Sequence, residues 1–197
     1  MNYLFKYLIR KYNALNYLLW GKFIVKASLY EYVIDNSVFN VSPRITGRYI
    51  TIDENNFEEY RRLFLNENMD LILERIYVHH DKCITFVVGT EIAYRMFMST
   101  RRTYFEPAIN ANYEIPTNAV FLYDSQTKKE YEGMSIYSSS FSPFFSLALT
   151  LGKKRVLACV LDTNIVPSKT LRRFKFKVIQ KNIYVPSLGI TKSWGKH

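Results

Sequence analysis

The sequence predicts a fold of the α/β (α+β) class, in which helices flank a central mixed β-sheet. Three observations support this prediction. Short apolar runs bounded by turn residues alternate with segments of helical periodicity. A Gly-Thr turn at residues 89–90 joins two of these apolar runs, as in a β-hairpin. The run at residues 155–161 is apolar throughout, which is typical of a parallel strand buried on both faces.

The first half of the chain supplies four of the expected strands and two helices. The strands are expected at residues 22–34, 48–52, 83–88 and 91–99. A helix is expected to follow a capping Asp53 or Asn55. The shared apolar face of that helix would carry Phe57, Tyr60, Leu63 and Phe64. A second helix is expected at residues 71–77.

The second half continues with a strand, a helix, a strand, a helix and one or two final strands. These elements are expected at residues 118–124, 138–151, 155–161, 168–174 and 176–185. Pro143 must delay or kink the first of these helices, and Gly152 is placed to end it. Residues 101–116 are polar and aromatic, and are expected to form a loop or a short hairpin that could cover a ligand.

The N-terminal segment, residues 1–26, is predicted to be an amphipathic basic helix that precedes a single main domain of residues 27–197. Leucines recur in it at helical spacing, with basic residues between them: Leu4, Leu8, Leu15, Leu18 and Leu19, and Lys6, Arg10 and Lys11. No apolar run reaches the roughly 18 residues that cross a bilayer, and the pattern of a signal peptide is missing. Two placements stay open: packing on the domain, which is the commoner one, and binding to an anionic membrane surface.

The net charge of the chain bears on the class of its ligand. The charge is +10 at pH 7, and the pI is about 9.5. Lys and Arg are scattered in short pairs, whereas a nucleic-acid-binding protein would concentrate them on one element. A phosphorylated small molecule is therefore the preferred anionic partner, and no nucleic-acid partner is expected.

The two cysteines and the only internal histidine pair do not form a metal site. Cys83 and Cys159 each lie in an apolar run and lack a metal-binding or redox spacing. Buried thiols of this kind suit a reducing cytoplasm, which is the expected location, with a peripheral contact at the inner membrane face left open. His79 and His80 have no Cys or Glu at ligand spacing, so no metal is expected.

A candidate phosphate-binding loop follows the strand at residues 118–124. Small residues at 130–137 lead from this strand into a helix, and free backbone N–H groups at such a helix start attract phosphate. The groups concerned belong to Met134, Ser135, Ile136, Tyr137 and Ser138. An ordinary polar turn before a helix is the alternative. A phosphate site beside the end of a strand would suit a coenzyme.

Over about residues 45–185, the order of these segments resembles the GNAT superfamily of acyl-CoA-dependent N-acyltransferases. The shared features are a strand–helix–helix opening, the hairpin, the coenzyme loop, and a buried strand followed by Asn164 with Phe176 twelve positions on. Glu132 departs from the Arg or Gln of the family loop, and Ser135 and Tyr137 stand at its two small positions. Lys175 replaces the Gly that usually precedes the aromatic residue.

This resemblance implies a GNAT-like fold, acyl-CoA as a co-substrate and no tightly bound cofactor. It implies that Ser125 and Thr127 hold the pantetheine arm through their backbones, and that Asn164 contacts the same arm through its side chain. The loop has a Tyr, Tyr137, directly after its isoleucine. This variant of the loop resembles that of GNAT enzymes encoded with polysaccharide genes, which acylate nucleotide-linked amino sugars. A sugar nucleotide for a cell-surface polysaccharide is therefore the expected acceptor, and a homodimer is left open.

Acyl transfer to an amine needs a polarised thioester carbonyl, and the acceptor ammonium must lose a proton to become a nucleophilic amine. Backbone donors near a strand bulge at residues 123–125 would polarise the carbonyl. Asp124 is the candidate base, with capping of the following turn as an equal alternative. The family often places a general-acid Tyr where this chain has Leu171, so Tyr184 or Tyr137 could replace it, or water could take the proton.

Three further residues are candidates for binding the acceptor. His79 and His80 precede a strand and could face the acceptor, although a polar turn is the commoner role of such a pair. Arg95 interrupts an apolar strand and could bind an acceptor phosphate. A place on the solvent face of the hairpin is the favoured interpretation of Arg95. A membrane-surface-associated binding protein that uses its N-terminal helix is the alternative function.

Overall fold

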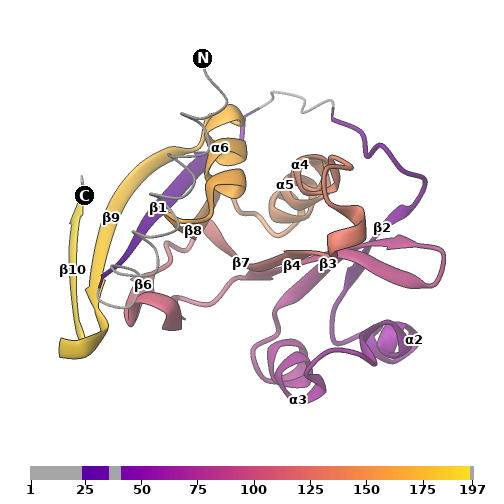
Figure 1. Cartoon of the computed structure of the whole chain (residues 1–197). Coiled ribbons are helices and arrows are strands. Elements are labelled where there is room, and N and C mark those ends of the chain that lie inside the picture. Colours follow the sequence, from indigo (N-terminus) through magenta and orange to yellow (C-terminus); the bar gives the residue numbers. More distant parts are fainter. Residues whose placement is uncertain (1–23, 36–40, 196–197) are drawn as a thin grey trace. The chain divides into compact units, whose positions relative to one another are not determined.

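The computed structural model describes residues 24–35 and 41–195, and these residues form two compact units. The first unit comprises residues up to 30, 105–113 and 159 onward, and the second comprises residues 31–104 and 114–158. Figure 1 shows the course of the chain. Residues 1–23 of the predicted N-terminal helix lie outside the described residues. Strand β1 (Val25–Val33) begins at Val25, within the last two residues of the segment predicted to be helical. The proposed domain boundary stays a prediction.

The second unit contains the strand order β8-β7-β4-β3-β2. These strands are β2 (Arg48–Ile52), β3 (Lys82–Val88), β4 (Glu91–Ser99), β7 (Ala119–Thr127) and β8 (Arg155–Leu161), the last of which continues into the first unit. Strands β7 and β8 pair in parallel, and the other neighbours pair antiparallel. The predicted hairpin is confirmed, and Gly89 makes its turn with a φ of 60° that disfavours other residues.

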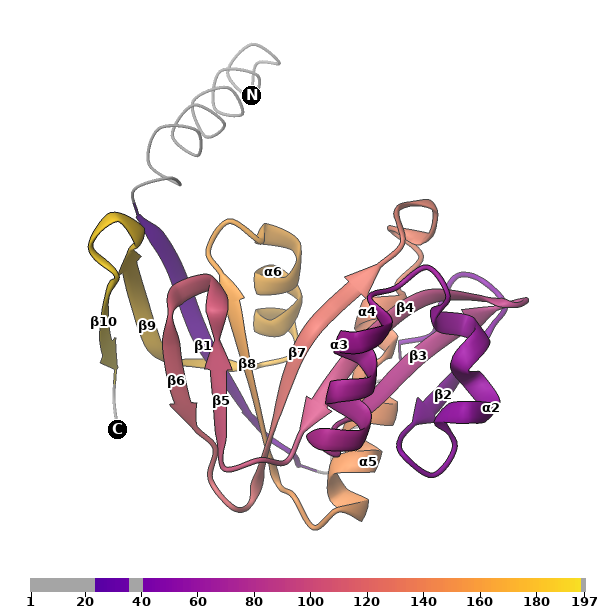
Figure 2. The same cartoon turned by 90° about the horizontal axis from the view of Figure 1, so that it is seen from below.

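Helices cover both faces of this sheet (Figures 1 and 2). One face carries α2 (Phe57–Tyr60), η1 (Arg61–Phe64), α3 (Met69–Leu73) and η2 (Glu74–Val78), and the other carries α4 (Ile136–Ser139) and α5 (Phe141–Thr150). Phe57, Phe64, Phe97, Phe121, Phe141 and Phe144 are fully buried in this unit. Because each aromatic ring removes a large apolar area from water, these residues dominate its core.

Two helix ends differ from each other in how well the sequence predicted them. The capping role of Asp53 or Asn55 was wrong, because α2 begins after Asn56, whose side chain accepts a hydrogen bond from the N–H of Asp53 at 2.9 Å. Gly152 ends α5 as expected, with φ 71° and a hydrogen bond from its N–H to Leu149 at 2.9 Å. The predicted effect of Pro143 is also seen, since the helical backbone is divided at Ser140.

Over its described residues, the first unit contains the strand order β10-β9-β1-β8 and the α-helix α6 (Ile165–Arg173). Strands β9 (Lys177–Val185) and β10 (Ile190–Gly195) form an antiparallel hairpin through η5 (Pro186–Leu188). The predicted covering segment is a short hairpin of β5 (Thr103–Glu106), η3 (Pro107–Ile109) and β6 (Ala111–Glu114). The parallel and antiparallel pairs and the flanking helices confirm the predicted mixed sheet.

Candidate functional site

Strand β7 pairs differently along its length. Its first four residues pair in parallel with β8, from Ala119 opposite Arg155 to Leu122 opposite Ala158. The register with β8 stops at that point within the described residues, although β7 continues to Thr127. The later residues of β7 therefore have one edge that the β8 ladder does not use.

A β-bulge interrupts β7 directly after that point. Tyr123 lies opposite Phe97 and Gln126 lies opposite Arg95, so Asp124 and Ser125 together face a single residue of β4. Asp124 has a left-handed backbone with φ 46°, and Ser125 is exposed. A bulge leaves a residue out of the ladder and redirects its backbone groups. The bulge expected at residues 123–125 is therefore present, and it reaches the surface at Ser125.

The carboxylate of Asp124 lies between two arginines. Its Oδ2 accepts hydrogen bonds from Arg75 of η2 and from Nη1 of Arg95 at 2.5 Å. Burial alone would raise the pKa of Asp124, but the hydrogen bonds and charges of Arg95 and Arg75 outweigh it and hold this pKa below its ordinary value. A carboxylate with a lowered pKa is a weak proton acceptor, so this environment does not favour Asp124 as a general base. Its partners are arginines and not the following turn, so the capping alternative gains no support.

Arg95 is buried, with 7% of its surface exposed, and the interpretation that it lies on the solvent face of the hairpin is wrong. Its Nη2 lies 3.2 Å from Glu67 and 2.8 Å from the side-chain oxygen of Gln126, in addition to the Nη1 contact with Asp124. Burial would lower the pKa of Arg95, but the two carboxylates raise it above its ordinary value. Burial is tolerated because the charge is paired. An acceptor phosphate would have to compete with these partners, and that role stays a prediction.

The other face of the bulge is tied to the start of the following helix. Ser125 donates a hydrogen bond to the hydroxyl of Tyr94 at 3.3 Å, and Ser140 donates one to the same hydroxyl at 3.2 Å. Tyr94 is fully buried, and burial raises its pKa well above the ordinary value, so the phenol stays neutral. The bulge of β7 and the junction of α4 with α5 thus share one buried hydroxyl.

The candidate phosphate loop runs from η4 (Lys129–Tyr131) to α4. Gly133 and Ser135 have left-handed backbones, with φ 78° and 60°. Tyr49 donates a hydrogen bond at 2.7 Å to the carbonyl of Ile136, which anchors the helix start to β2. The N–H groups of Ser135 and Ile136 have no protein acceptor among the described residues, whereas that of Met134 is directed to Tyr131 at 3.4 Å. Tyr137 and Ser138 follow in the first turn of α4.

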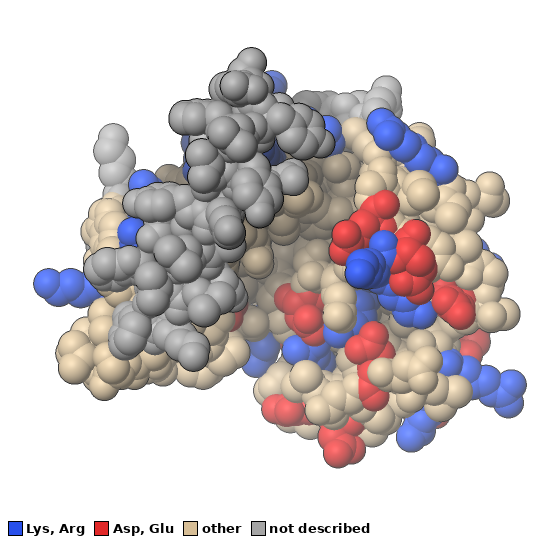
Figure 3. Space-filling view, in the orientation of Figure 1, with Lys and Arg blue, Asp and Glu red and all other residues tan. Residues whose placement is uncertain are grey.

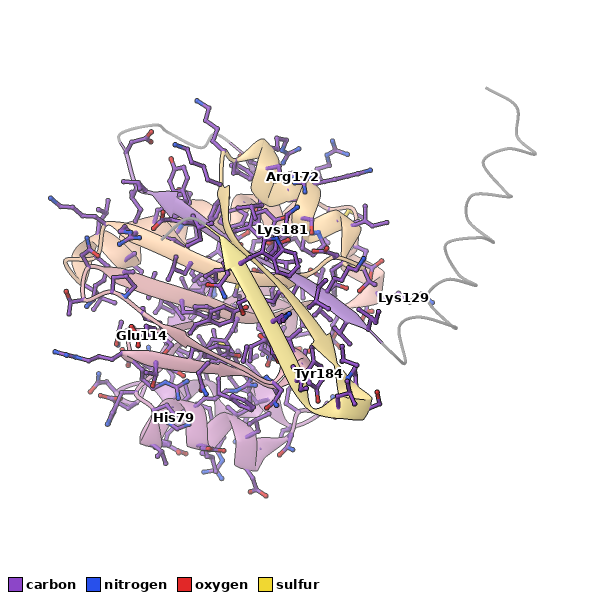
Figure 4. The ribbon with its side chains drawn as sticks, turned by 90° about the vertical axis from the view of Figure 1, so that its left-hand side faces the viewer. His79, Glu114, Lys129, Arg172, Lys181 and Tyr184 are labelled. Atoms are coloured by element: carbon purple, nitrogen blue, oxygen red, sulfur yellow. The ribbon has the colours of Figure 1, made fainter. Side chains whose placement is uncertain are left out.

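The predicted acceptor histidines lie in the turn that follows η2. The Nε2 of His79 is 3.3 Å from Glu74, and the Nδ1 of His80 is 2.6 Å from Glu54. His79 lies at the end of η2 in Figure 4. Each histidine has a glutamate partner and neither contacts the residues of the bulge, so their position matches the polar-turn alternative. Their role in acceptor binding stays a prediction.

Three further predicted site residues each have a defined place in their own element. Thr127 is paired with Tyr94 in the β4–β7 ladder. Asn164 occupies the N-cap position of α6 without a side-chain capping bond, and Tyr184 lies opposite Thr191 near the end of β9 that leads into η5 (Figure 4). Asn164 and Tyr184 belong to the first unit, and their proposed roles stay predictions.

Several residues of the site were missed by sequence reasoning. Beside Asp124 these are Arg75 and Glu67, and on the other face they are Tyr94 and Tyr49. The buried Asp81 was missed as well: it is 1% exposed, and its Oδ2 accepts a hydrogen bond of 2.5 Å from the hydroxyl of Tyr123. The one available signal was the charge of Arg95 inside an apolar run, which requires a buried partner.

Two surface properties bear on the class of ligand: possible metal-binding groups and the distribution of charge. Among residues 24–35 and 41–195, no group of three or more His, Cys, Asp or Glu side chains could hold a metal ion. On the face seen in Figure 3, acidic and basic side chains are intermixed over this unit. In the part of the chain that the structure describes, no helix has the length and apolar character needed to cross a bilayer.

Comparison with known proteins supports the fold through structure alone. No family model matches the chain, and no curated protein sequence matches it. A GNAT-family protein from Novosphingobium aromaticivorans is similar with a TM-score of 0.56 at 10% identity, covering 88% of this chain and 66% of that protein. A GNAT-family acetyltransferase from Colwellia psychrerythraea gives 0.52 at 10% identity, covering 81% and 54%.

A third similar structure is the aminoglycoside N-acetyltransferase AAC(6')-Iy in complex with CoA. Its TM-score is 0.50 at 12% identity, covering 66% of this chain and 91% of that enzyme. The chain spans less than two thirds of the length of the Novosphingobium and Colwellia proteins. Likeness at these identities establishes shared architecture. The chain has the fold of the GNAT family of acetyltransferases.

Proposed function

We propose that this protein transfers an acyl group from acyl-CoA to the amine of a small acceptor. The observation that carries the proposal is the bulge of β7 at Asp124 and Ser125, which begins where the β7–β8 ladder ends. The phosphate-loop candidate follows it along the chain, and Tyr94 joins the bulge to Ser140 at the end of α4, the short helix that this loop precedes. Acyl-CoA is a thioester on a phosphorylated arm. A free strand edge can pair with the arm, redirected backbone groups can polarise the thioester, and a helix start can bind the phosphates.

In the proposed binding mode, the strand edge and the loop hold different parts of acyl-CoA. The backbone edge at Ser125 and Thr127 pairs with the amides of the pantetheine arm. The N–H groups of Ser135 and Ile136, with the rest of the first turn of α4, face the pyrophosphate. Glu132 is exposed in this loop and places an unfavourable charge beside the expected phosphate.

In the proposed reaction, the amine nitrogen attacks the thioester carbonyl carbon and forms a C–N bond. Backbone N–H groups at the bulge stabilise the oxygen anion that develops. The C–S bond then breaks, the amide remains on the acceptor, and CoA leaves as a thiol that carries the proton lost by the amine. The lowered pKa of Asp124 favours proton removal by water over removal by this carboxylate.

A pH–rate profile separates these two routes for the proton. If Asp124 is the base, Asp124→Asn abolishes turnover at every pH. Water-assisted transfer predicts that the variant keeps measurable turnover and an unshifted profile. The profile requires only the acyl-CoA substrate and any accepted amine.

The proposed acceptor is an amino sugar, in the finer form a nucleotide-linked amino sugar used for cell-surface polysaccharide. The name of the similar AAC(6')-Iy enzyme says that it acetylates aminoglycosides, which carry amino groups on sugars. A net charge of +10 suits two anionic substrates, CoA and a sugar nucleotide. Release of free CoA thiol with nucleotide-linked amino sugars, but not with their N-acetylated forms, would support this acceptor; release only with unphosphorylated amines would overturn it.

Thermal stabilisation by acetyl-CoA tests coenzyme binding without knowledge of the acceptor. A ligand that binds only the folded state must raise the melting temperature. Glu132→Arg should strengthen this shift, because it removes a negative charge beside the proposed pyrophosphate. Glu59→Arg makes the same charge change on α2, on the opposite face of the sheet, and should leave the shift unchanged. A wild-type protein that no acyl-CoA stabilises would overturn the proposal.

A peripheral membrane contact is a separate proposal, carried by the basic amphipathic sequence of residues 1–20. Co-sedimentation with anionic vesicles, with and without these residues, tests it. Binding that depends on residues 1–20 would support the contact, and no binding of the full chain would exclude it.

A further inference from the structure

The bulge of β7 has an unfavourable residue at its centre. Asp124 takes a left-handed backbone with φ 46°, a conformation that glycine adopts freely and other residues seldom adopt. Nothing in the local sequence stabilises this conformation, because the residues on both sides belong to an extended strand. Contacts from elsewhere in the unit must hold it.

Two arginines from different elements supply those contacts on one face. Arg75 comes from η2 and Arg95 from β4, and both donate to Oδ2 of Asp124. Nη1 of Arg95 also lies 3.5 Å from the main-chain oxygen of Asp124, so it contacts both ends of the residue. Glu67 balances the second positive charge at 3.2 Å from Nη2 of Arg95. Charge is therefore neutral across the group, which allows it to be buried.

Arg75 also contacts the last pair of residues before the bulge. Its guanidinium carbon lies 4.6 Å from the ring centre of Phe97 and 5.2 Å from that of Tyr123. These two residues face each other across the β4–β7 ladder. One cation thus contacts both rings of the final regular pair and the carboxylate of the first bulged residue, a combination that suits a guanidinium.

We propose that Arg75 and Arg95 form a clamp on Asp124 that sets the direction of the bulge backbone, and that they are positioning residues for acyl transfer. The inference rests on the proposed function, since the backbone groups so directed are the ones that face the thioester. Asp124 then acts through its shape and charge as the anchor of the clamp, and not as a proton acceptor. On the opposite face of the bulge, the hydrogen bond from Ser125 to the hydroxyl of Tyr94 holds the backbone in place.

The clamp makes a prediction about how its members combine. Glycine adopts the left-handed conformation without support from other residues. Asp124→Gly therefore removes the carboxylate that the arginines bind, and position 124 no longer depends on that contact for its backbone conformation. In that background, Arg75→Met should change turnover by less than about 2-fold, because its effect passes through Asp124. In the wild-type background the same substitution should lower kcat by roughly 10- to 100-fold, through misdirected backbone donors. An additive combination would contradict the clamp.

The conservative variants separate positioning from chemistry. Asn tolerates the left-handed region and its side-chain oxygen can accept from both arginines, so Asp124→Asn should keep most of kcat with an unshifted pH profile. Arg75→Lys keeps the charge but loses the planar contact, and should fall between wild type and Arg75→Met. In all of these, the loss of kcat should exceed any loss of affinity for acetyl-CoA, because the proposed pyrophosphate contacts at the start of α4 are left intact.

The test begins with hydrogen–deuterium exchange of protein without coenzyme. In Arg75→Met, amides of residues 123–127 should exchange at least about 10-fold faster, and those of residues 119–122 should be unchanged. Arg61→Met removes an exposed arginine that forms an ion pair with Glu58 on the same helical stretch, and serves as the matched control. Unchanged exchange at residues 123–127 would overturn the clamp whatever the activity.

Activity then separates the two claims. A wild type that neither binds acetyl-CoA nor releases its thiol refutes the proposed function, while faster exchange in Arg75→Met still supports the clamp as a structural device. A wild type that is active, with Arg75→Met turning over equally fast, refutes the positioning role. If Arg75→Met does not fold, Arg75→Lys and the Asp124→Gly background supply the same comparison.

Discussion

The two halves of strand β7 are built on different physical principles. Residues 119–122 are buried and apolar. All four pair with β8, and Phe121 and Leu122 also pair with β4 on the other side. Residues 123–127 carry the bulge, leave the β8 ladder and end in polar, partly exposed side chains. The first half is held by burial and a regular ladder. The second half is held by paired charges and buried hydroxyls, which leave its backbone available to a ligand.

The largest expected effect is a loss of folding stability when a buried side chain in the first half of β7 is truncated. Phe121 is fully buried and stacks on Tyr104 at a ring separation of 4.3 Å. Phe121→Ala should destabilise the protein by about 3–5 kcal/mol, through lost burial and the cavity left behind. Urea unfolding measures this loss. Phe105→Ala, at a residue that is 50% exposed, is the control and should cost far less; equal losses would contradict the difference in burial.

A smaller effect is expected from the hydroxyl that supports the second half. Tyr94→Phe removes the group that accepts hydrogen bonds from Ser125 and Ser140. The expected loss is about 1–2 kcal/mol, the value of one or two buried hydrogen bonds. The same variant should weaken stabilisation by acetyl-CoA, because it uncouples the bulge from Ser140 at the end of α4. An unchanged response to acetyl-CoA would show that the link has no part in binding.

The candidate phosphate loop offers a substitution that should raise stability. Ser135 has φ 60°, which glycine adopts without a steric penalty. Ser135→Gly should therefore stabilise the protein by roughly 0.5–1 kcal/mol. Ser146→Gly, in the exposed middle of α5, should instead destabilise it by roughly 0.5 kcal/mol. Thermal unfolding compares the two, and a loss at both sites would contradict the assigned strain.

The smallest expected effect is on pH dependence, because two aspartates of the site act in opposite directions. The lowered pKa of Asp124 gives stability that is present above the unfolded value of about 3.9 and is lost as pH falls through the folded pKa. Burial raises the pKa of Asp81, against the effects of Tyr123, Ser99 and Arg101, so stability falls as pH rises from about 3.9 through that raised pKa.

Single variants separate the two contributions. Asp124→Asn should flatten the loss of stability in acid, because the charge that is protonated there is gone. Asp81→Asn should become less harmful relative to wild type as pH rises. Chemical denaturation at a series of pH values between acid and neutral measures both slopes. Parallel slopes for the two variants would contradict the opposite pKa shifts.

The same contrast explains what could be predicted from the sequence. The apolar run of the first half, the hairpin and the helix that ends at Gly152 follow local pattern and turn chemistry. The bulge was expected only through the family resemblance. Its partners could not be predicted, because Arg75 lies 49 residues from Asp124 in a helix where one charged position looks like any other. The prediction that Arg95 lies on the solvent face of the hairpin was wrong, because the local sequence pattern does not reveal a carboxylate that is distant in the sequence.

Hydrogen–deuterium exchange of the wild-type protein with and without saturating acetyl-CoA tests the central claim most directly. The claim is that the second half of β7 and the loop before α4 bind the coenzyme through their backbones. Acetyl-CoA should slow exchange at residues 123–127 and 133–138 and leave residues 119–122 unchanged. Unchanged exchange in both of the first two segments would contradict the account.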